Sequence, residues 1–368
     1  MGKANYFLKK DDQANNYFNQ VLSRYPLHKR ALEIGYFQSK ILYNNEQWTA
    51  CIENCLVFKD KFANEDLGKV EILMALTYLK LNDRERAYSI LNNVSGQYKN
   101  LAKIELSKIY LMENQLKAAS KAISTIYGEL NEPLKAEVTY LKGKIAFINR
   151  SWFEAKSLFN GYLKTYSKSL KIAEVRFLLA FIPFEQKNYE EAIKSLGSYK
   201  LSSTNAFYIT QADYFIARSY EESGQIVLAL SQYEELVRQG FKSEYYSEAL
   251  LRLYKVFKTK QNQEKVEYYL NLLANSSQED IKRFALKEMV LKHLSSDLEE
   301  SRTFFAKLTP NSKDKIWYIK ELLKAEQITE ALKHLNAFGS KPEDLLESEW
   351  EELIFLKSET LFNNQQYA

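Results

Sequence analysis

A small residue recurs at intervals of about 32 to 37 positions along this 368-residue chain. The first seven of these small-residue positions, and three less regular ones, are Ala14, Cys51, Ala87, Ala119, Ala155, Ala192 and Ala229, then Val266, Ser301 and Ala331. A bulky residue such as Phe18, Leu91 or Phe159 often follows four positions later, one helical turn along the same face. Repeats of this length are paired helices stacked in a line, so the sequence predicts an all-α array of about ten repeats.

A second small residue precedes six consecutive small-residue positions by twelve residues: Ser39, Ala75, Ser107, Gly143, Ala180 and Ala217. Two facing small positions let two helices approach closely. In this setting the chain resembles the tetratricopeptide repeat, an antiparallel helix pair of about 34 residues. The segment 181–196, with Asn188-Tyr189-Glu190-Glu191-Ala192-Ile193, is similar to its turn and second helix, and Ala14, Phe18, Val21 and Pro26 match its spaced signature.

The resemblance implies a right-handed superhelical solenoid of antiparallel helix pairs. We expect clear repeats over residues 1–274 and degenerate repeats over 275–368, which continue the array to a truncated end. The pattern is weakest around Tyr254 and Met289, where large residues occupy small-residue positions. Pro183 falls inside a predicted first helix, so a kink or an early helix end is expected near Ile182. Neither end carries a polar cap, so we expect a piece of a longer array.

The charges and the reactive side chains favour a non-enzymatic protein. The 51 basic and 47 acidic residues give a net charge of +4 and form no charged tail, so charge alone predicts neither a nucleic-acid nor a membrane partner. Cys51 and Cys55 occupy expected packing positions, and the three histidines lie in distant repeats. No phosphate-binding loop or serine elbow occurs. We therefore expect no catalytic residue, cofactor or metal site.

The face of the first helices is the predicted binding site. In proteins that the chain resembles, this face lines the concave side, so residues three before, one after and four after its small residue should point inward. These positions are rich in rings and cations, and Lys255 continues the row of cations. The predicted groove residues are Tyr36, Lys40, Tyr43, Lys108, Tyr140, Lys144, Phe147, Phe177, Phe181, Phe184, Tyr214 and Arg218. Such a groove would bind a peptide or helix that is apolar and partly acidic.

The leading functional hypothesis is a scaffold or adaptor that binds other proteins through this groove or its edges. The segment 18–26 and the similar 158–167 resemble the bacterial cell-envelope branch of the family, which implies a periplasmic location, with a cytoplasmic one as the alternative. A ring or collar component of an envelope machine such as the flagellar motor is a more specific version. Direct membrane insertion is not expected, and self-association is an open alternative.

Two further hypotheses stay open. A single-stranded RNA-binding helical repeat could stack bases on the rings and contact phosphates with the lysines, although acidic residues such as Glu174 and Glu221 share the predicted face. The chain could also be the peptide-sensing part of a regulator that lacks its effector domain.

Overall fold

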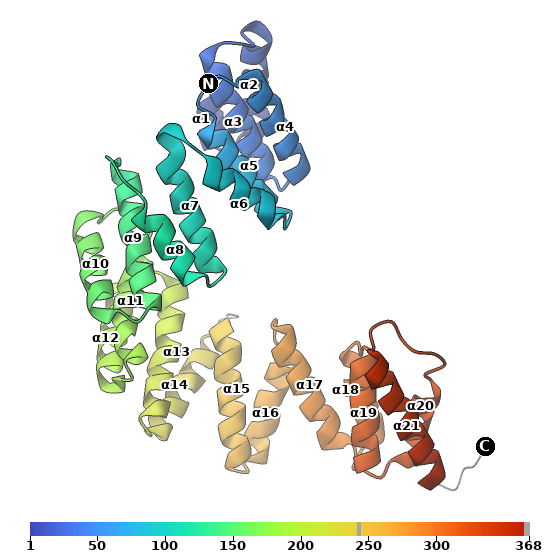
Figure 1. The fold of residues 1–368 in the computed structure, drawn as a ribbon. Helices are drawn as coiled ribbons and strands as arrows, with labels where there is room; N and C mark the ends of the chain where they lie inside the picture. Colours follow the sequence, from blue (N-terminus) through green and yellow to red (C-terminus); the bar gives the residue numbers. More distant parts are fainter. Residues whose placement is uncertain (241–243, 364–368) are drawn as a thin grey trace. The chain divides into compact units, whose positions relative to one another are not determined.

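The computed structural model describes residues 1–240 and 244–363, and within these two ranges the chain forms helices joined by turns and loops, without a β-strand. It divides into two compact units, Met1–Ile182 and a second that begins at Pro183. Figure 1 shows that successive helices in each unit run in opposite directions and lie side by side. The predicted fold class, an all-α array of antiparallel helix pairs, is confirmed.

The helices of the first unit form consecutive pairs, α1 with α2, α3 with α4, α5 with α6, α7 with α8, and α9 with α10. Their bounds are α1 (Gly2–Phe7), α2 (Asp11–Arg24), α3 (Lys29–Asn44), α4 (Trp48–Lys61), α5 (Gly68–Lys80), α6 (Arg84–Asn93), the 3-10 turn η1 (Gly96–Tyr98), α7 (Lys99–Met112), α8 (Leu116–Ser124), α9 (Glu132–Ile148) and α10 (Trp152–Thr165), followed by α11 (Ile172–Glu185), whose last residues belong to the second unit.

The second unit repeats the same arrangement. Its helices are α12 (Tyr189–Ser202), α13 (Ala206–Glu222), α14 (Ile226–Arg238), α15 (Glu244–Thr259), α16 (Gln263–Leu273), α17 (Glu279–His293), α18 (Leu298–Lys307), α19 (Ser312–Lys324), α20 (Ile328–Asn336) and α21 (Glu347–Asn363). Helices pair through the weak part of the sequence pattern as well, where α15 packs on α16 and α17 on α18. Tyr254 and Met289 are buried there in place of small residues.

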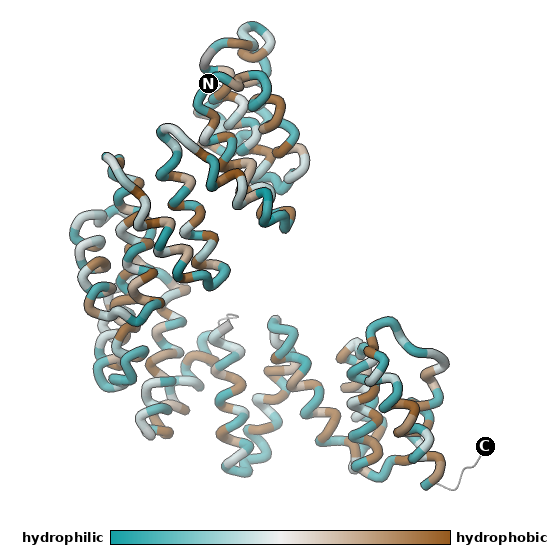
Figure 2. The backbone as a smooth tube through the Cα atoms, viewed as in Figure 1, coloured by the Kyte–Doolittle hydropathy of each residue, from teal (hydrophilic) through white to brown (hydrophobic). Residues whose placement is uncertain are grey.

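The small-residue positions lie where the two helices of a pair meet. Ala87, Ala119 and Ala155 are fully buried, and a Cβ atom added to Gly143 of α9 would lie 2.5 Å from the ring of Phe159 on α10. Only a residue without a side chain fits that contact, so the spacing read from the sequence marks the helix interfaces. Figure 2 shows the hydrophobic and hydrophilic residues alternating along each helix, as expected when one side is buried.

A recurring turn joins the two helices of most pairs. After α3, Glu46 adopts a left-handed backbone conformation with φ 59°. The amide of Gln47 donates to the carbonyl of Leu42 at 2.9 Å, and the amide of Glu46 donates to that of Tyr43 at 3.2 Å. These are the two bonds of a Schellman motif, which satisfies carbonyls at the end of a helix. Left-handed residues occupy the equivalent place at Lys9, Asn82, Asn114, Arg150, Lys187, Gly224, Gln261 and Glu326.

Pro183 does not end its helix early, because α11 continues to Glu185. The expected end near Ile182 is therefore wrong. Pro183 lies in the last turn of α11, where the loss of one amide donor removes a single helical hydrogen bond, and its carbonyl accepts the amide of Asn188 at 2.9 Å in the closing turn.

Candidate protein-binding site

Nine of the predicted groove residues lie in the first unit, on its first helices, which are α3, α5, α7, α9 and the part of α11 up to Ile182. We call their shared side the first-helix face of this unit. Contacts link neighbouring members of the set: α3 lies against α5, α5 against α7, and α7 against α9. The repeat spacing places equivalent residues of successive first helices next to one another, so their side chains can interact along the array.

The rings on this face are of two kinds. Tyr140 and Phe177, each 4% exposed, belong to the hydrophobic core. They were expected to face a ligand, but both rings are buried. Tyr36, Tyr43, Phe147 and Phe181 remain partly exposed. Burial raises the pKa of Tyr36 and of Tyr43, so both phenols stay neutral at physiological pH.

Phe147, Trp152 and Phe181 form a half-exposed aromatic patch, which we call the ring cluster. The ring of Phe147 on α9 lies 5.5 Å from that of Trp152 on α10, edge to face, and 6.3 Å from that of Phe181 on α11. Phe181 in turn stacks on the buried Phe177 at 5.6 Å. The core therefore holds the cluster in place, and its outer surface is an ordered apolar contact area.

Two cations of this face, Lys108 and Lys144, are ion-paired within the protein. Lys108 on α7 lies 2.9 Å from Glu105 and 3.0 Å from Glu137 on α9. Burial acts to lower the pKa of Lys108, but the two carboxylates outweigh it and the pKa is raised. Lys144 on α9 likewise lies 3.1 Å from Glu174 on α11. The cations that were expected to steer an acidic partner instead link consecutive repeats.

The carboxylates that pair with these lysines also bind neighbouring groups. The phenol of Tyr140 donates to Glu174 at 2.6 Å. Lys171 lies 3.9 Å from the centre of the Tyr140 ring and 3.6 Å from a carboxylate oxygen of Glu137. Glu174 was expected on this face, but its contacts with Lys144 and Tyr140 were not predicted. The sequence did contain a signal for these contacts. A glutamate lies three residues before the ring in both repeats, with Glu137 before Tyr140 and Glu174 before Phe177.

Lys40 differs from the other lysines of the face. Its ammonium lies 4.4 Å from the centre of the Tyr43 ring, and burial lowers its pKa. The described residues provide no ion pair for it, and its ammonium makes a cation–π contact with the Tyr43 ring.

The predicted residues of the second unit are also occupied internally. Tyr214 is buried, and Phe184 packs edge to face on Phe215 at 5.0 Å and on Tyr189 at 5.8 Å. Arg218 lies 2.6 Å from Glu222, and its pKa is raised because hydrogen bonding to Glu222 outweighs burial. Lys255, in contrast, is exposed.

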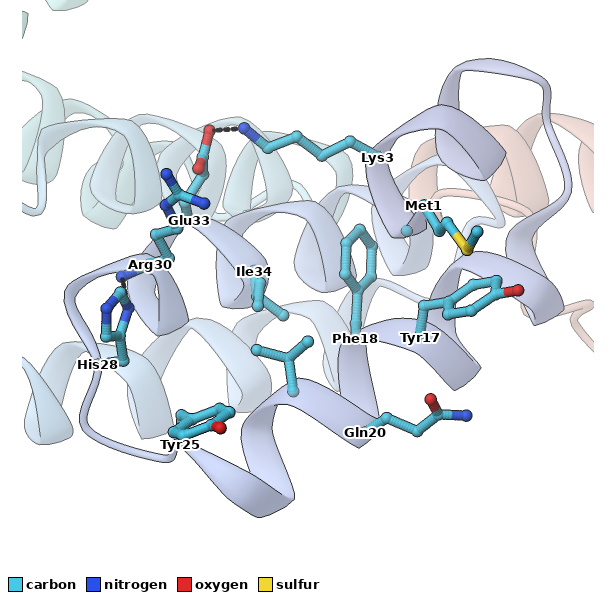
Figure 3. Close-up of a pocket in the computed structure, with 12 residues that line it drawn as sticks. Met1, Lys3, Tyr17, Phe18, Gln20, Tyr25, His28, Arg30, Glu33 and Ile34 are labelled. Atoms are coloured by element: carbon cyan, nitrogen blue, oxygen red, sulfur yellow. Dashed lines mark hydrogen bonds and ion pairs between the residues drawn. The ribbon is translucent and has the colours of Figure 1, made fainter.

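A pocket of 820 Å³ between α1, α2 and α3 was not predicted (Figure 3). Phe18 and Ile34 form its apolar floor, and an ion pair between Lys3 and Glu33 lies at its rim. Val21 lines the pocket with two exposed rings, Tyr17 of α2 and Tyr25, which follows the end of that helix. The spacing of four between these three residues was the available sequence signal.

The structure places the cysteines in the core, as predicted. Both thiols are fully buried and reduced. The thiol of Cys51 donates to the carbonyl of Ser39 at 3.2 Å, across the pair formed by α3 and α4. In the described ranges no group of three His, Cys, Asp or Glu residues could hold a metal ion, and no helix is long and apolar enough to cross a membrane.

Comparison with known proteins agrees with this fold. A sequence model of the tetratricopeptide repeat matches residues 1–28. Curated proteins gave no match. The described chain therefore has the fold of tetratricopeptide-repeat proteins, and the repeat's sequence signature is recognised at its start.

Three solved structures illustrate the likeness. The apo form of RapI is 15% identical, with 91% of this chain and 98% of that chain covered and a TM-score of 0.52. The Cut9–Hcn1 hetero-tetramer of APC/C is 15% identical, with a TM-score of 0.50; 68% of this chain is covered but only 47% of that chain. A tetratricopeptide repeat protein from Parabacteroides merdae is 11% identical, covers 67% and 93%, and has a TM-score of 0.46. At these identities the likeness concerns the fold alone.

Proposed function

We propose that this protein is a non-enzymatic scaffold that binds a partner protein through the ring cluster on the first-helix face of its first unit. The observation that carries the proposal is the half-exposed patch formed by Phe147, Trp152 and Phe181. Aromatic residues held rigidly by a core lose little side-chain entropy on binding and are enriched among residues that dominate protein interfaces. An apolar helix or peptide is the partner segment that such a patch fits.

The ion pairs of Lys108 and Lys144 reduce the contribution that charge should make to this binding. Lys108 and Lys144 already contact carboxylates, so an acidic partner would have to displace Glu137 or Glu174 before it could use them. Apolar contact with the rings is therefore expected to outweigh charge steering. The same ion pairs weigh against the RNA hypothesis, because Lys108 and Lys144 are already paired with carboxylates and are not available to bind phosphates.

The location in the cell is a separate proposal. The short resemblance of residues 18–26 and 158–167 to bacterial envelope proteins motivates a periplasmic scaffold, including the version in which it belongs to a ring or collar of a flagellar motor. Fractionation of source cells, followed by detection of the chain, tests this directly. Recovery with the cytoplasmic fraction would exclude the periplasmic version, and the regulator hypothesis would then gain weight.

The binding proposal is tested by affinity capture from soluble and envelope fractions of the source cells, with protein and RNA identified in parallel. The double variant Phe147→Ala and Phe181→Ala should lose the captured protein partner. Phe153→Ala is the matched control, because Phe153 is an exposed ring on α10 outside the cluster. Thermal unfolding of each variant verifies that the helices remain folded. Equal capture by the double variant and the control would exclude the ring cluster as the binding site.

A further inference from the structure

A second pocket, of 250 Å³, lies between α6, α7 and α8 of the first unit and has a basic rim. Lys99 and Lys103 on α7 are one helical turn apart, and Lys121 on α8 lines the same pocket. No acidic residue is among those that line it. Within the described chain no carboxylate forms an ion pair with any of these three lysines, whereas Lys59, Lys108, Lys144 and Lys171 of the same unit are all paired.

Neutral groups hold two of these ammonium groups in place. Lys99 donates to the phenol oxygen of Tyr127 at 3.0 Å, and Lys103 donates to the carbonyl of Thr125. Both ammonium groups also lie over the Tyr127 ring, 5.4 and 5.0 Å from its centre. Asn100 fixes the same loop by donating to the carbonyl of Tyr127 at 2.8 Å. The lysines are thus positioned, but their charges are not neutralised.

The positive charges beside the pocket are strong enough to shift the pKa of an exposed side chain, Tyr127. The hydrogen bond from Lys99 is the main cause of a lowered pKa at Tyr127, and the charge of Lys103 adds to it. Three like charges around one pocket repel each other, and an anion placed between them would remove that repulsion.

The floor of the pocket is apolar. Leu91, Val94 and Leu106 line it, together with Ala118 and Ala122 of α8. A volume of 250 Å³ is below the roughly 300–1,000 Å³ of drug-sized ligand sites, so it suits one or two side chains. A nucleic-acid backbone would satisfy the lysines but would leave this floor without a partner. An acidic peptide with an apolar residue satisfies both.

We propose that this pocket binds an acidic peptide segment of a partner protein, with one apolar side chain on the floor and carboxylates on Lys99, Lys103 and Lys121. This surface does not depend on the ring cluster. The two sites are formed by different residues, so either proposal can fail without the other.

The probe is a fluorescein-labelled peptide with one leucine between aspartate and glutamate pairs, titrated against the full chain by fluorescence anisotropy. The triple variant Lys99→Gln, Lys103→Gln and Lys121→Gln should bind it roughly tenfold more weakly or worse. The matched control Lys142→Gln, Lys156→Gln and Lys164→Gln removes the same charge from exposed lysines of α9 and α10 and should bind normally. Replacement of the peptide's leucine by serine should also weaken binding.

Lys121→Glu provides a second variant, because no contact of the Lys121 ammonium within the described chain would be lost and the fold should be unaffected. It should weaken peptide binding as well. Equal binding by wild type and both pocket variants, or equal loss in the control, would overturn the proposal. A short labelled oligouridylate that binds more tightly than the peptide, and loses affinity in the same pocket variants, would overturn the assignment to an acidic peptide.

Discussion

The two units hold their helix pairs together in different ways. The first unit relies on small residues at the helix crossings, such as Gly143 and Ala155, and its core consists of several separate clusters. The second unit has one continuous cluster from Tyr214 to Leu353, in which the small Ala229 and Ala331 are accompanied by large residues such as Tyr254. It also contains nearly buried carboxylates, including Asp314 and Glu330.

Those carboxylates link helices in the second unit. Asp314 of α19 lies within ion-pair distance of Arg283 and Lys287 of α17, and Glu330 of α20 lies 2.6 Å from Arg302 of α18. Close approach of two backbones at small residues and ion pairs between helices are thus two ways of holding neighbouring helices together. The first unit should be sensitive to added volume, and the second should be sensitive to acid.

The largest expected difference is the response to an enlarged small-residue position. Ala155→Leu in the first unit should overpack the pair formed by α9 and α10 and cost about 1–3 kcal/mol of unfolding free energy. Val266→Leu at the equivalent position of α16 should cost less than about 0.5 kcal/mol, because Val266 is partly exposed. Urea unfolding of both variants measures the difference. Equal costs would show that the two units are packed alike.

Acid should weaken the second unit first. Burial acts to raise the pKa values of Asp314 and Glu330, but Lys287 and Arg283 around the first and Arg302 beside the second outweigh it, and both pKa values are lowered. The stability from a lowered carboxylate pKa is present above its unfolded-state value and is lost as pH falls through the folded-state value. The losses should therefore begin below about pH 4.5.

Urea unfolding between about pH 6 and pH 3 measures this dependence. Asp314→Asn should cost about 1.5–3 kcal/mol at neutral pH, by the usual value of a hydrogen bond to a charged group, and should flatten the acid slope. Asp60→Asn, at an exposed carboxylate of the first unit, should leave the slope unchanged. An unchanged slope in Asp314→Asn would mean that this network does not set the acid stability of the second unit.

The smallest effect should be the same in both units. Arg150 and Gln261 occupy equivalent left-handed turn positions, with φ 59° and 56°. Replacing either by glycine should stabilise the chain by about 0.5–1 kcal/mol, because glycine adopts this conformation without strain. Gly224→Ala, at φ 78°, should have the opposite effect. Thermal unfolding measures all three, and a gain in only one unit would make the turns part of the difference between units.

The sequence was sufficient to predict the fold and the helix interfaces, because these depend on spacing within a single repeat. Ala87 and Ala155 were assigned to buried positions from periodicity alone, and both are fully buried. Which side chains of the predicted groove are available to a partner depends, in contrast, on contacts between repeats. Whether Lys108 is available depends on Glu137, which lies 29 positions later on another helix, and the periodicity of one helix carries no information about such a pairing.

The basic pocket could not be predicted from the sequence either. Lys99, Lys103 and Lys121 are unremarkable in a chain with nearly equal numbers of acidic and basic residues. What distinguishes them is that all three line one pocket without an acidic residue, and that arrangement can be seen only in the fold. The buried position of Tyr140 was missed for a similar reason, since its phenol donates to Glu174 on a helix of the next repeat.

Because the left-handed turns are equivalent, the length of this protein can change by one helix pair at a time. Because Glu46 and Asn82 have the same backbone conformation and hydrogen bonding, deleting the segment between them would join one equivalent turn to another. Duplicating that segment would do the same. Gene-level gain or loss of a single helix pair could thus lengthen or shorten the molecule without requiring a new junction to evolve.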